Sequence, residues 1–244
     1  MPDHFDDCSM ARRGRHGHSS TQKDTSGVVN FFAFANRLTR LRNIRLYRVV
    51  CSAVTGVALI ASIASPARAQ ESDAGHVEAR LRDTETHPER YPPDDWAVLS
   101  SFQVSQGDML RAAFWFYMYQ IRSRPWARAD TGGGGAAALR ASFNATLGAD
   151  INEWIGADPE LWRSVVERAI AYEAKLPLYA GRPPGTDQAT WLKTVERERR
   201  AYADEAKAAF TKMDPAEVAR TRKENSHFVG ALSDKGRPLD DSWR

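Results

Sequence analysis

Apolar residues are concentrated in one stretch of the chain. From Met109 to Ile121, only Arg111 and Gln120 interrupt a run of aliphatic and aromatic side chains. A helix that is apolar on every face is buried on most sides, because no face is left for water. The pattern therefore predicts a central core helix over 104–124.

The expected ends of this helix are a capping box formed by Ser105 and Asp108 and a stop at Pro125. Further along, apolar residues recur at helical spacing between Gly- and Pro-containing breaks, and no segment has the alternation of a strand. The sequence thus predicts an all-α fold, a single bundle-like domain of four to five main helices. The further helices are predicted over 136–147, 158–175 and 188–212, with shorter ones at 150–156 and 215–225.

The N-terminal part of the chain has the pattern of a Sec-type signal peptide over 36–69. A basic segment is followed by an apolar run of small and branched residues, and Ala67 and Ala69 then occupy the −3 and −1 positions of a cleavage site. Cleavage after Ala69 would make Gln70 the first residue of the exported chain. The alternative is an uncleaved anchor, but the apolar run is shorter than the roughly 20 residues that span a bilayer.

The other boundaries follow from composition. Residues 1–35 are polar and lack an apolar period, so they are either a disordered extension or lie upstream of the true translation start. Residues 70–95 are charged and poor in apolar side chains, which favours a flexible or loosely docked arm. The helical domain is expected over 96–244 and ends in an irregular tail, on which Trp243 either docks or hangs free.

Net charge and cysteine content differ between residues 1–69, called the leader here, and the rest of the chain. Residues 1–69 carry a net charge of +6, whereas residues 70–244 carry −3, so the basic balance of the whole chain comes from the leader. No nucleic-acid partner is expected from such a charge. Both cysteines, Cys8 and Cys51, lie in the leader, which excludes disulfides and thiolate chemistry from the exported part. A periplasmic or secreted location is expected, with no stable membrane span after cleavage.

Catalytic chemistry has few candidates. No metal-binding spacing is present, no metal or other cofactor is expected, and His227 is the one histidine near the helical body. Glu153, on the short helix beside Trp154, is a weak candidate for the carboxylic acid of a cell-envelope hydrolase. The competing interpretation is that Trp154 packs inward and Glu153 faces water. Whether the protein is an enzyme stays open, with the balance against it.

Two clusters could bind a ligand or a partner. Trp115, Tyr117, Tyr119 and Arg122 lie on the aromatic helix, within 109–122, where polar tips need partners that are either internal or part of a ligand. Plain core packing is the competing interpretation for these residues.

The second cluster, formed by Tyr179, Arg182 and Trp191, surrounds a Pro/Gly-rich loop and contains the residue types enriched in binding hot spots. Alternatively, Tyr179 and Trp191 only pin this loop to the next helix.

These observations favour an exported, non-catalytic binding or accessory protein. Its expected partner is another envelope protein of unknown identity, which it would bind as an inhibitor, an immunity-type protector or an assembly factor does. The first alternative is a carboxylate-dependent envelope hydrolase that uses Glu153. The second is a small-ligand binder that uses the aromatic helix over 109–122.

Overall fold

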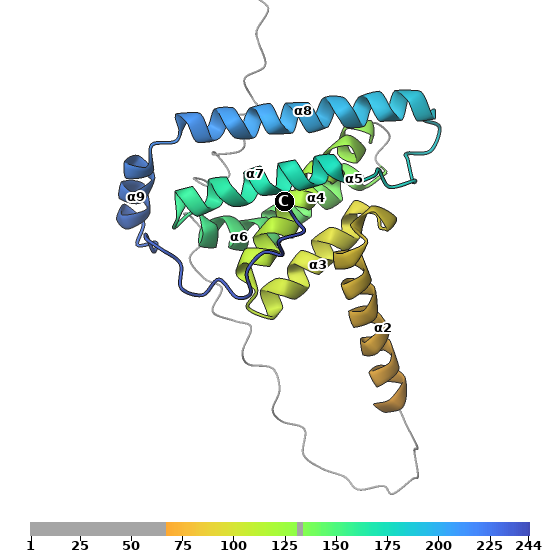
Figure 1. Ribbon diagram of the computed structural model, residues 1–244, viewed down its shortest axis with the longest axis horizontal. Helices are drawn as coiled ribbons and strands as arrows, with labels where there is room; N and C mark the ends of the chain where they lie inside the picture. Colours follow the sequence, from red (N-terminus) through yellow and green to blue (C-terminus); the bar gives the residue numbers. More distant parts are fainter. Residues whose placement is uncertain (1–66, 131–133) are drawn as a thin grey trace, which may run out of the picture.

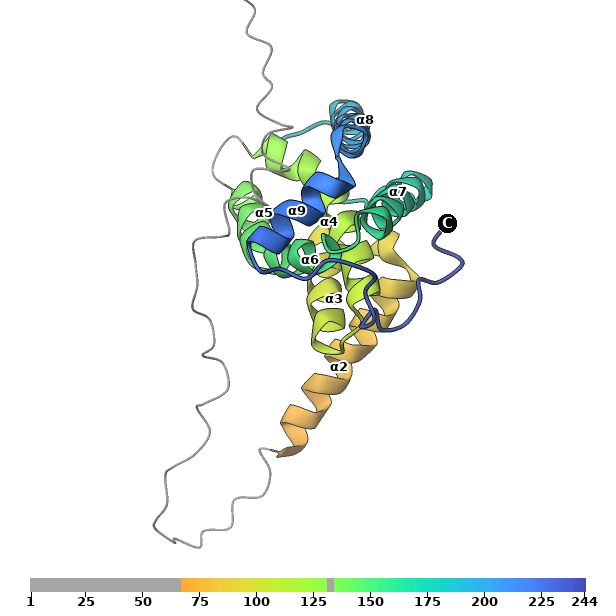
Figure 2. The same ribbon diagram turned by 90° about the vertical axis from the view of Figure 1, so that its left-hand side faces the viewer.

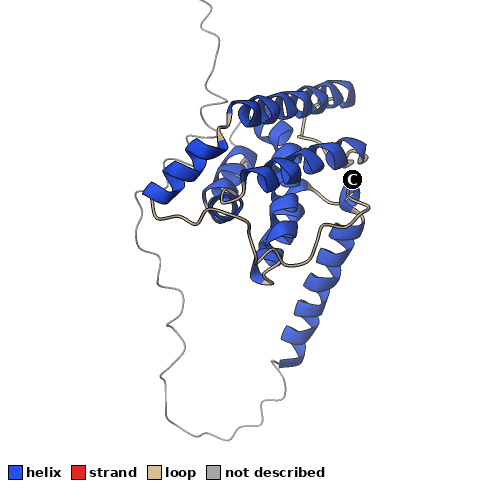
Figure 3. Ribbon diagram, turned by 60° about the vertical axis from the view of Figure 1, so that its left-hand side comes forward, coloured by secondary structure: helices blue, strands red, loops and turns tan. Residues whose placement is uncertain are grey.

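A computed structural model describes residues 67–130 and 134–244, and within them all regular secondary structure is helical, with no strand (Figures 1 and 3). The predicted all-α class is confirmed. The predicted count of four to five helices is too low, because the described residues form eight α-helices and one 3₁₀ turn. These elements are α2 (Ala67–Thr86), η2 (Pro88–Arg90), α3 (Pro93–Ser105), α4 (Met109–Ala129), α5 (Ala136–Ala145), α6 (Leu147–Ile155), α7 (Pro159–Lys175), α8 (Gln188–Lys212) and α9 (Pro215–Glu224).

Helix α4 forms the centre of the molecule, as its apolar sequence predicts. Every residue from Ala112 to Ser123 is buried, and α3, α5, α6, α7 and α8 all contact the helix (Figure 1). Aspartate side chains cap the N-termini of α7 and α8. Asp158 accepts a hydrogen bond from the Leu161 amide at the start of α7, and Asp187 accepts one from the Thr190 amide at the start of α8.

Both predicted ends of the core helix are wrong. Gly107, at φ +74°, turns the chain between α3 and α4, so α4 begins at Met109 instead of continuing from 104. Pro125 lies inside α4, which runs on to Ala129. The helix continues past the proline because its last turn is packed: the Trp126 ring lies edge-on to Trp191, with the ring centroids 5.2 Å apart.

The segment predicted as an arm, 70–95, is mostly helical, since it contains most of α2, then η2 and the start of α3. Among the α2 side chains whose burial the structure describes, 75–86, Leu81 is the one apolar side chain that joins the core, so this part of the sequence shows no apolar stripe. Polar contacts dock the second half of α2 instead. Glu85 accepts hydrogen bonds from Gln103 and Arg111, both at 3.1 Å, while the first half of α2 projects from the body (Figures 1 and 2).

The expected signal peptide falls largely on residues 36–66, outside the described part of the chain, as does the expected extension over 1–35. The expected cleavage residues Ala67, Ala69 and Gln70 lie in the first turn of α2.

A buried ion-pair network joins α4, α7 and α8. Arg122 donates from Nε to Glu173 Oε1 at 2.5 Å, and Arg199 donates from Nη2 to the same oxygen at 2.7 Å. The Arg122 and Glu173 side chains are 3% and 1% exposed. Burial lowers the pKa of Arg122, whose guanidinium lies over the Trp96 ring at 4.9 Å. Breaking such a pair is costly, since the remaining charge has no water to solvate it.

We expect Glu173→Ala to lower the free energy of unfolding by about 3–5 kcal/mol, because Arg122 would keep its buried charge without a counterion. Urea denaturation followed by circular dichroism measures the effect. Glu167 is exposed on the same helix, so Glu167→Ala should stay within about 0.5 kcal/mol of the unmodified chain. Equal losses in the two variants would contradict a stabilising role for the network.

Candidate functional site

A groove of about 520 Å³ opens on the surface where α6, the last turn of α9 and the following loop meet. In sequence its walls lie far apart, since they come from 150–157, from Arg222 and from 228–234. Apolar side chains and carboxylates both line it, a mixture typical of sites that bind another molecule. The lining residues are Asp150, Glu153, Trp154, Ala157, Arg222, Phe228, Leu232, Ser233 and Asp234.

Glu153 lies on this wall and is tied to α9. Arg222 donates from Nη2 to both the backbone oxygen and Oε1 of Glu153, each at 2.9 Å. His227 Nδ1 lies 2.7 Å from the same Oε1. The structure therefore brings together the two residues that the sequence singled out separately as possible catalytic groups. In this arrangement the Glu153 carboxylate accepts from Arg222 and lies against His227.

The turn after α9 places His227 against Glu153. The His227 amide donates to the Arg222 carbonyl at 2.9 Å, and the Ser226 amide donates to the Lys223 carbonyl at 3.0 Å. This is the hydrogen-bond pattern of a Schellman C-cap, which requires a left-handed residue at the position of Ser226. Ser226 has φ +61° and is the one non-glycine residue with positive φ in the described chain. A strained residue thus holds the turn.

The loop after this turn supplies the apolar part of the groove. The Phe228 ring is 60% exposed, whereas Leu232 is buried beneath the loop. The loop is fixed by its own contacts: Arg222 Nε donates to the Phe228 carbonyl at 2.9 Å, and the Gly230 amide donates to Ala157 at 3.0 Å. An exposed aromatic ring on a fixed backbone is well suited to contact a partner, because little conformational entropy is lost on binding.

Negative charge predominates along the groove. Its lining holds three carboxylates, on Asp150, Glu153 and Asp234, and one guanidinium, which already pairs with Glu153. Asp234 accepts a hydrogen bond from Trp154 Nε1 at 3.1 Å, so this indole ring is fixed at its polar edge. Partial burial raises the pKa of Asp150. No group of three or more His, Cys, Asp or Glu residues within the described ranges could hold a metal ion.

The aromatic residues of α4 that the sequence singled out lie in the core. Trp115, Tyr117, Tyr119 and Arg122 are each at most 3% exposed. The Tyr117 hydroxyl donates to Asn152 Oδ1 at 2.7 Å, and burial raises its pKa well above 10. Burial likewise raises the pKa of Tyr119 to about 12. These positions are those expected from core packing, the competing interpretation of the pattern.

The second predicted cluster does not form one exposed surface. Trp191 is buried against Trp126, and the Tyr179 ring is half-buried close over Gly181. Arg182 is exposed but is used within the loop, where it donates to the Thr186 carbonyl at 2.9 Å and to Gln188. This geometry favours the interpretation in which aromatic rings pin the loop to the body.

Sequence reasoning missed the roles of Arg222, Phe228 and Asp234. No spacing rule relates α6 to α9, and an isolated phenylalanine in an irregular tail gives no signal. A charged residue close to a Gly-containing loop is equally common in linkers. The groove exists because the fold brings separate segments together, and side chains such as these are found only from coordinates.

Comparison with protein-family models, with curated proteins and with solved structures gives no match. No helix in the described part of the chain combines the length and the apolar character needed to cross a lipid bilayer. The function is therefore inferred from the chemistry of the groove.

We expect Ser226→Gly to raise the free energy of unfolding by up to about 1 kcal/mol, because glycine adopts the left-handed conformation without a Cβ clash. The midpoint of urea denaturation measures the change. Ser164 is exposed inside α7, where Ser164→Gly should instead destabilise by about 0.5 kcal/mol. A loss of stability in Ser226→Gly would show that the serine side chain itself supports the turn.

Proposed function

We propose that the protein is an exported, non-catalytic binding protein of the cell envelope, periplasmic or secreted. Its role would be that of an inhibitor, an immunity-type protector or an assembly factor for another envelope protein. The leader sequence supports export, and the groove beside α6 and α9 supports binding. The observation that carries the binding role is the exposed Phe228 ring on a hydrogen-bonded loop above an acidic wall.

The composition of the groove defines the chemistry of its partner. Phe228 and Trp154 offer apolar surface, and Asp150 and Asp234 offer negative charge, since the one guanidinium of the lining, on Arg222, pairs with Glu153. A partner segment that carries an aliphatic or aromatic side chain next to Lys or Arg is complementary to both. Opposite charges then steer the encounter, while the aromatic contact supplies affinity.

A second candidate function, an envelope hydrolase, is favoured by the position of Glu153 beside His227 in an open groove. A glycosidase acid must donate a proton to the leaving oxygen. Here, however, Oε1 accepts from Arg222 and lies against His227, so the contacts suit an orienting carboxylate better than an acid. Wall-digestion activity that is lost in Glu153→Gln but retained in Glu196→Gln, on the exposed face of α8, would support the hydrolase.

We expect affinity purification of the tagged chain from envelope extract to recover one stoichiometric partner. Phe228→Ala should weaken that complex by about 30-fold, because truncating a hot-spot side chain costs about 2 kcal/mol. Leu192→Ala is the matched control, since Leu192 is 42% exposed on α8, away from the groove lining. Calorimetry with the purified partner measures both values.

The acidic lining also predicts that the rate of association depends on the salt concentration. Raising the salt concentration from about 0.05 to 0.5 M should slow association, because screening weakens the attraction between the groove and a basic segment. Phe228→Ala and Leu192→Ala complexes of equal affinity would rule out the groove as the docking surface.

A separate experiment tests the proposed export and the cleavage after Ala69. The intact mass of the protein recovered from the periplasm or the medium should correspond to a chain that begins at Gln70. Ala69→Arg should block cleavage, because the −1 position needs a small residue. Ala74→Arg, five residues downstream, should leave the mature start unchanged. A recovered chain that retains residues before Ala67 would contradict the proposed cleavage.

A further inference from the structure

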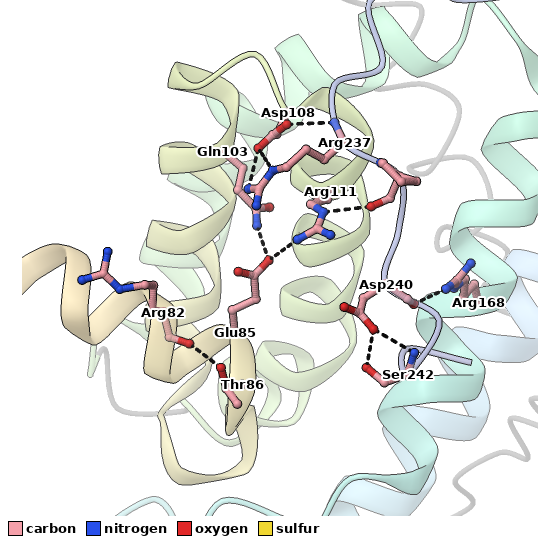
Figure 4. Close-up of polar contacts among 11 residues, drawn as sticks. Arg82, Glu85, Thr86, Gln103, Asp108, Arg111, Arg168, Arg237, Asp240 and Ser242 are labelled. Carbon is pink, nitrogen blue, oxygen red and sulfur yellow. Dashed lines mark hydrogen bonds and ion pairs between the residues drawn. The ribbon is translucent and has the colours of Figure 1, made fainter.

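Residues 235–244, called the C-terminal strap here, follow an extended path across the body after α9. The strap contains no helix, and it passes the first turn of α4 and the side of α7 (Figures 1 and 4). It nevertheless carries Trp243, which is 4% exposed. The predicted alternative in which Trp243 docks is the one observed. An extended segment with one buried aromatic side chain has the form of a peptide bound in a groove.

The body contacts the strap largely through the backbone of the strap. Side chains and an amide of α4 and α7 donate to carbonyl oxygens of the strap, and such contacts do not depend on the strap's side chains. The donors with their acceptors are Leu110 N to Lys235 (2.9 Å), Arg111 Nε to Pro238 (2.9 Å), Arg168 Nη2 to Asp240, Arg168 Nε to Trp243 (2.9 Å) and Lys175 Nζ to Arg244 (2.6 Å).

Trp243 supplies the specific anchor. Its ring stacks on Phe114, with centroids 5.0 Å apart and planes 9° from parallel, and lies edge-on to Trp115 at 5.2 Å. The Arg111 guanidinium lies over the ring at 5.0 Å. Rings and cation together form an aromatic pocket that suits indole, with its large face and its attraction for cations.

The first residues of the strap are held by an ion pair and by close packing of two backbone segments. Arg237 donates from its amide and from Nε to Asp108, at 2.9 and 2.6 Å (Figure 4). Gly236, at φ +72°, passes so close to Gly107 that a side chain would collide with its backbone. The surface of α4 and α7 beneath the strap, called the strap groove here, therefore fits a Gly–Arg pair at one end and an indole at the other.

Helix α9 buries no residue of its own. Residues 225–234 connect it to the strap and are themselves held by Arg222, Ala157 and Trp154. Once these contacts are released, ten residues can reach about 33 Å when extended. The contacts of the strap itself come from the turn before α4, from α4 and from α7, and they do not require the strap to belong to the same molecule.

We propose that the strap groove is a peptide-binding site filled by the chain's own strap, and that the strap of a second copy can replace it. A second copy is the occupant that these contacts favour, because it carries the complementary sequence in full: the Gly–Arg pair, the backbone spacing and the indole. Exchange of identical segments between copies keeps every contact of the closed form and yields a symmetric dimer. This proposal does not rest on the binding function proposed for the groove beside α6 and α9.

The experiment uses the full chain and a fluorescein-labelled synthetic peptide of residues 234–244. Arg237→Ala loosens the chain's own strap without changing the body, so the peptide should bind this variant at least ten-fold more tightly than the unmodified chain. Trp243→Ala should have a similar effect if it folds. A competing peptide that lacks the indole should displace the labelled one at least ten-fold less well. Fluorescence anisotropy measures each affinity.

Sedimentation equilibrium then tests exchange between copies. The unmodified chain should form a dimer as its concentration rises, and an excess of the free peptide should return it to the monomer. Peptide binding that is equal with and without the indole overturns the proposal, as does a lack of peptide binding to the folded Arg237→Ala chain. A chain that stays monomeric at every concentration while it binds the peptide overturns the exchange between copies.

Discussion

The structure depends on the burial of the central stretch of one helix, Ala112 to Ser123 of α4. Because this stretch has no face that suits water, the rest of the chain surrounds it, and most of the polar side chains along α4 pair with other elements. Each of these partners lies on a different element, so the contacts also set where that element sits along α4. The pairs are Arg111 with Glu85 of α2, Tyr117 with Asn152 of α6, Gln120 with Asn144 of α5, Arg122 with Glu173 of α7, and Arg124 with Glu198 and Glu205 of α8.

This constraint also explains how much of the fold the sequence could reveal. The apolar run gives a strong local signal, so the central position of α4 is predicted correctly while its two ends are not. Helix α2 was missed because polar contacts dock it. Helix α3 was missed because the expected helix start was placed at Ser105–Asp108, where Gly107 in fact turns the chain between α3 and α4. For the candidate site, the sequence identified Glu153. The partnership with Arg222, 69 residues away, follows only from the packing of α9 beside α6.

The segment after α9 links two surfaces that would otherwise be unrelated. Its first part lines the acidic groove through Phe228 and Asp234, and its second part, which begins at Lys235, lies along α4 and α7. Irregular chain of this kind is stable only where its polar backbone finds partners, and arginine side chains of the body provide them. A change in the seating of one part therefore shifts the other, because only a single peptide bond separates them.

The way in which α2 projects from the body has a practical consequence for handling the protein (Figure 1). Chain fused after Arg244 would emerge on the body itself, beside Lys175, whereas Val77 is 55% exposed on α2. No cysteine occurs among the described residues, since both lie at positions 8 and 51. A single thiol introduced at Val77, in a chain lacking the leader, would give one attachment point for a dye or a solid support. The acidic groove and the strap would both remain accessible, and every molecule on the surface would be oriented alike.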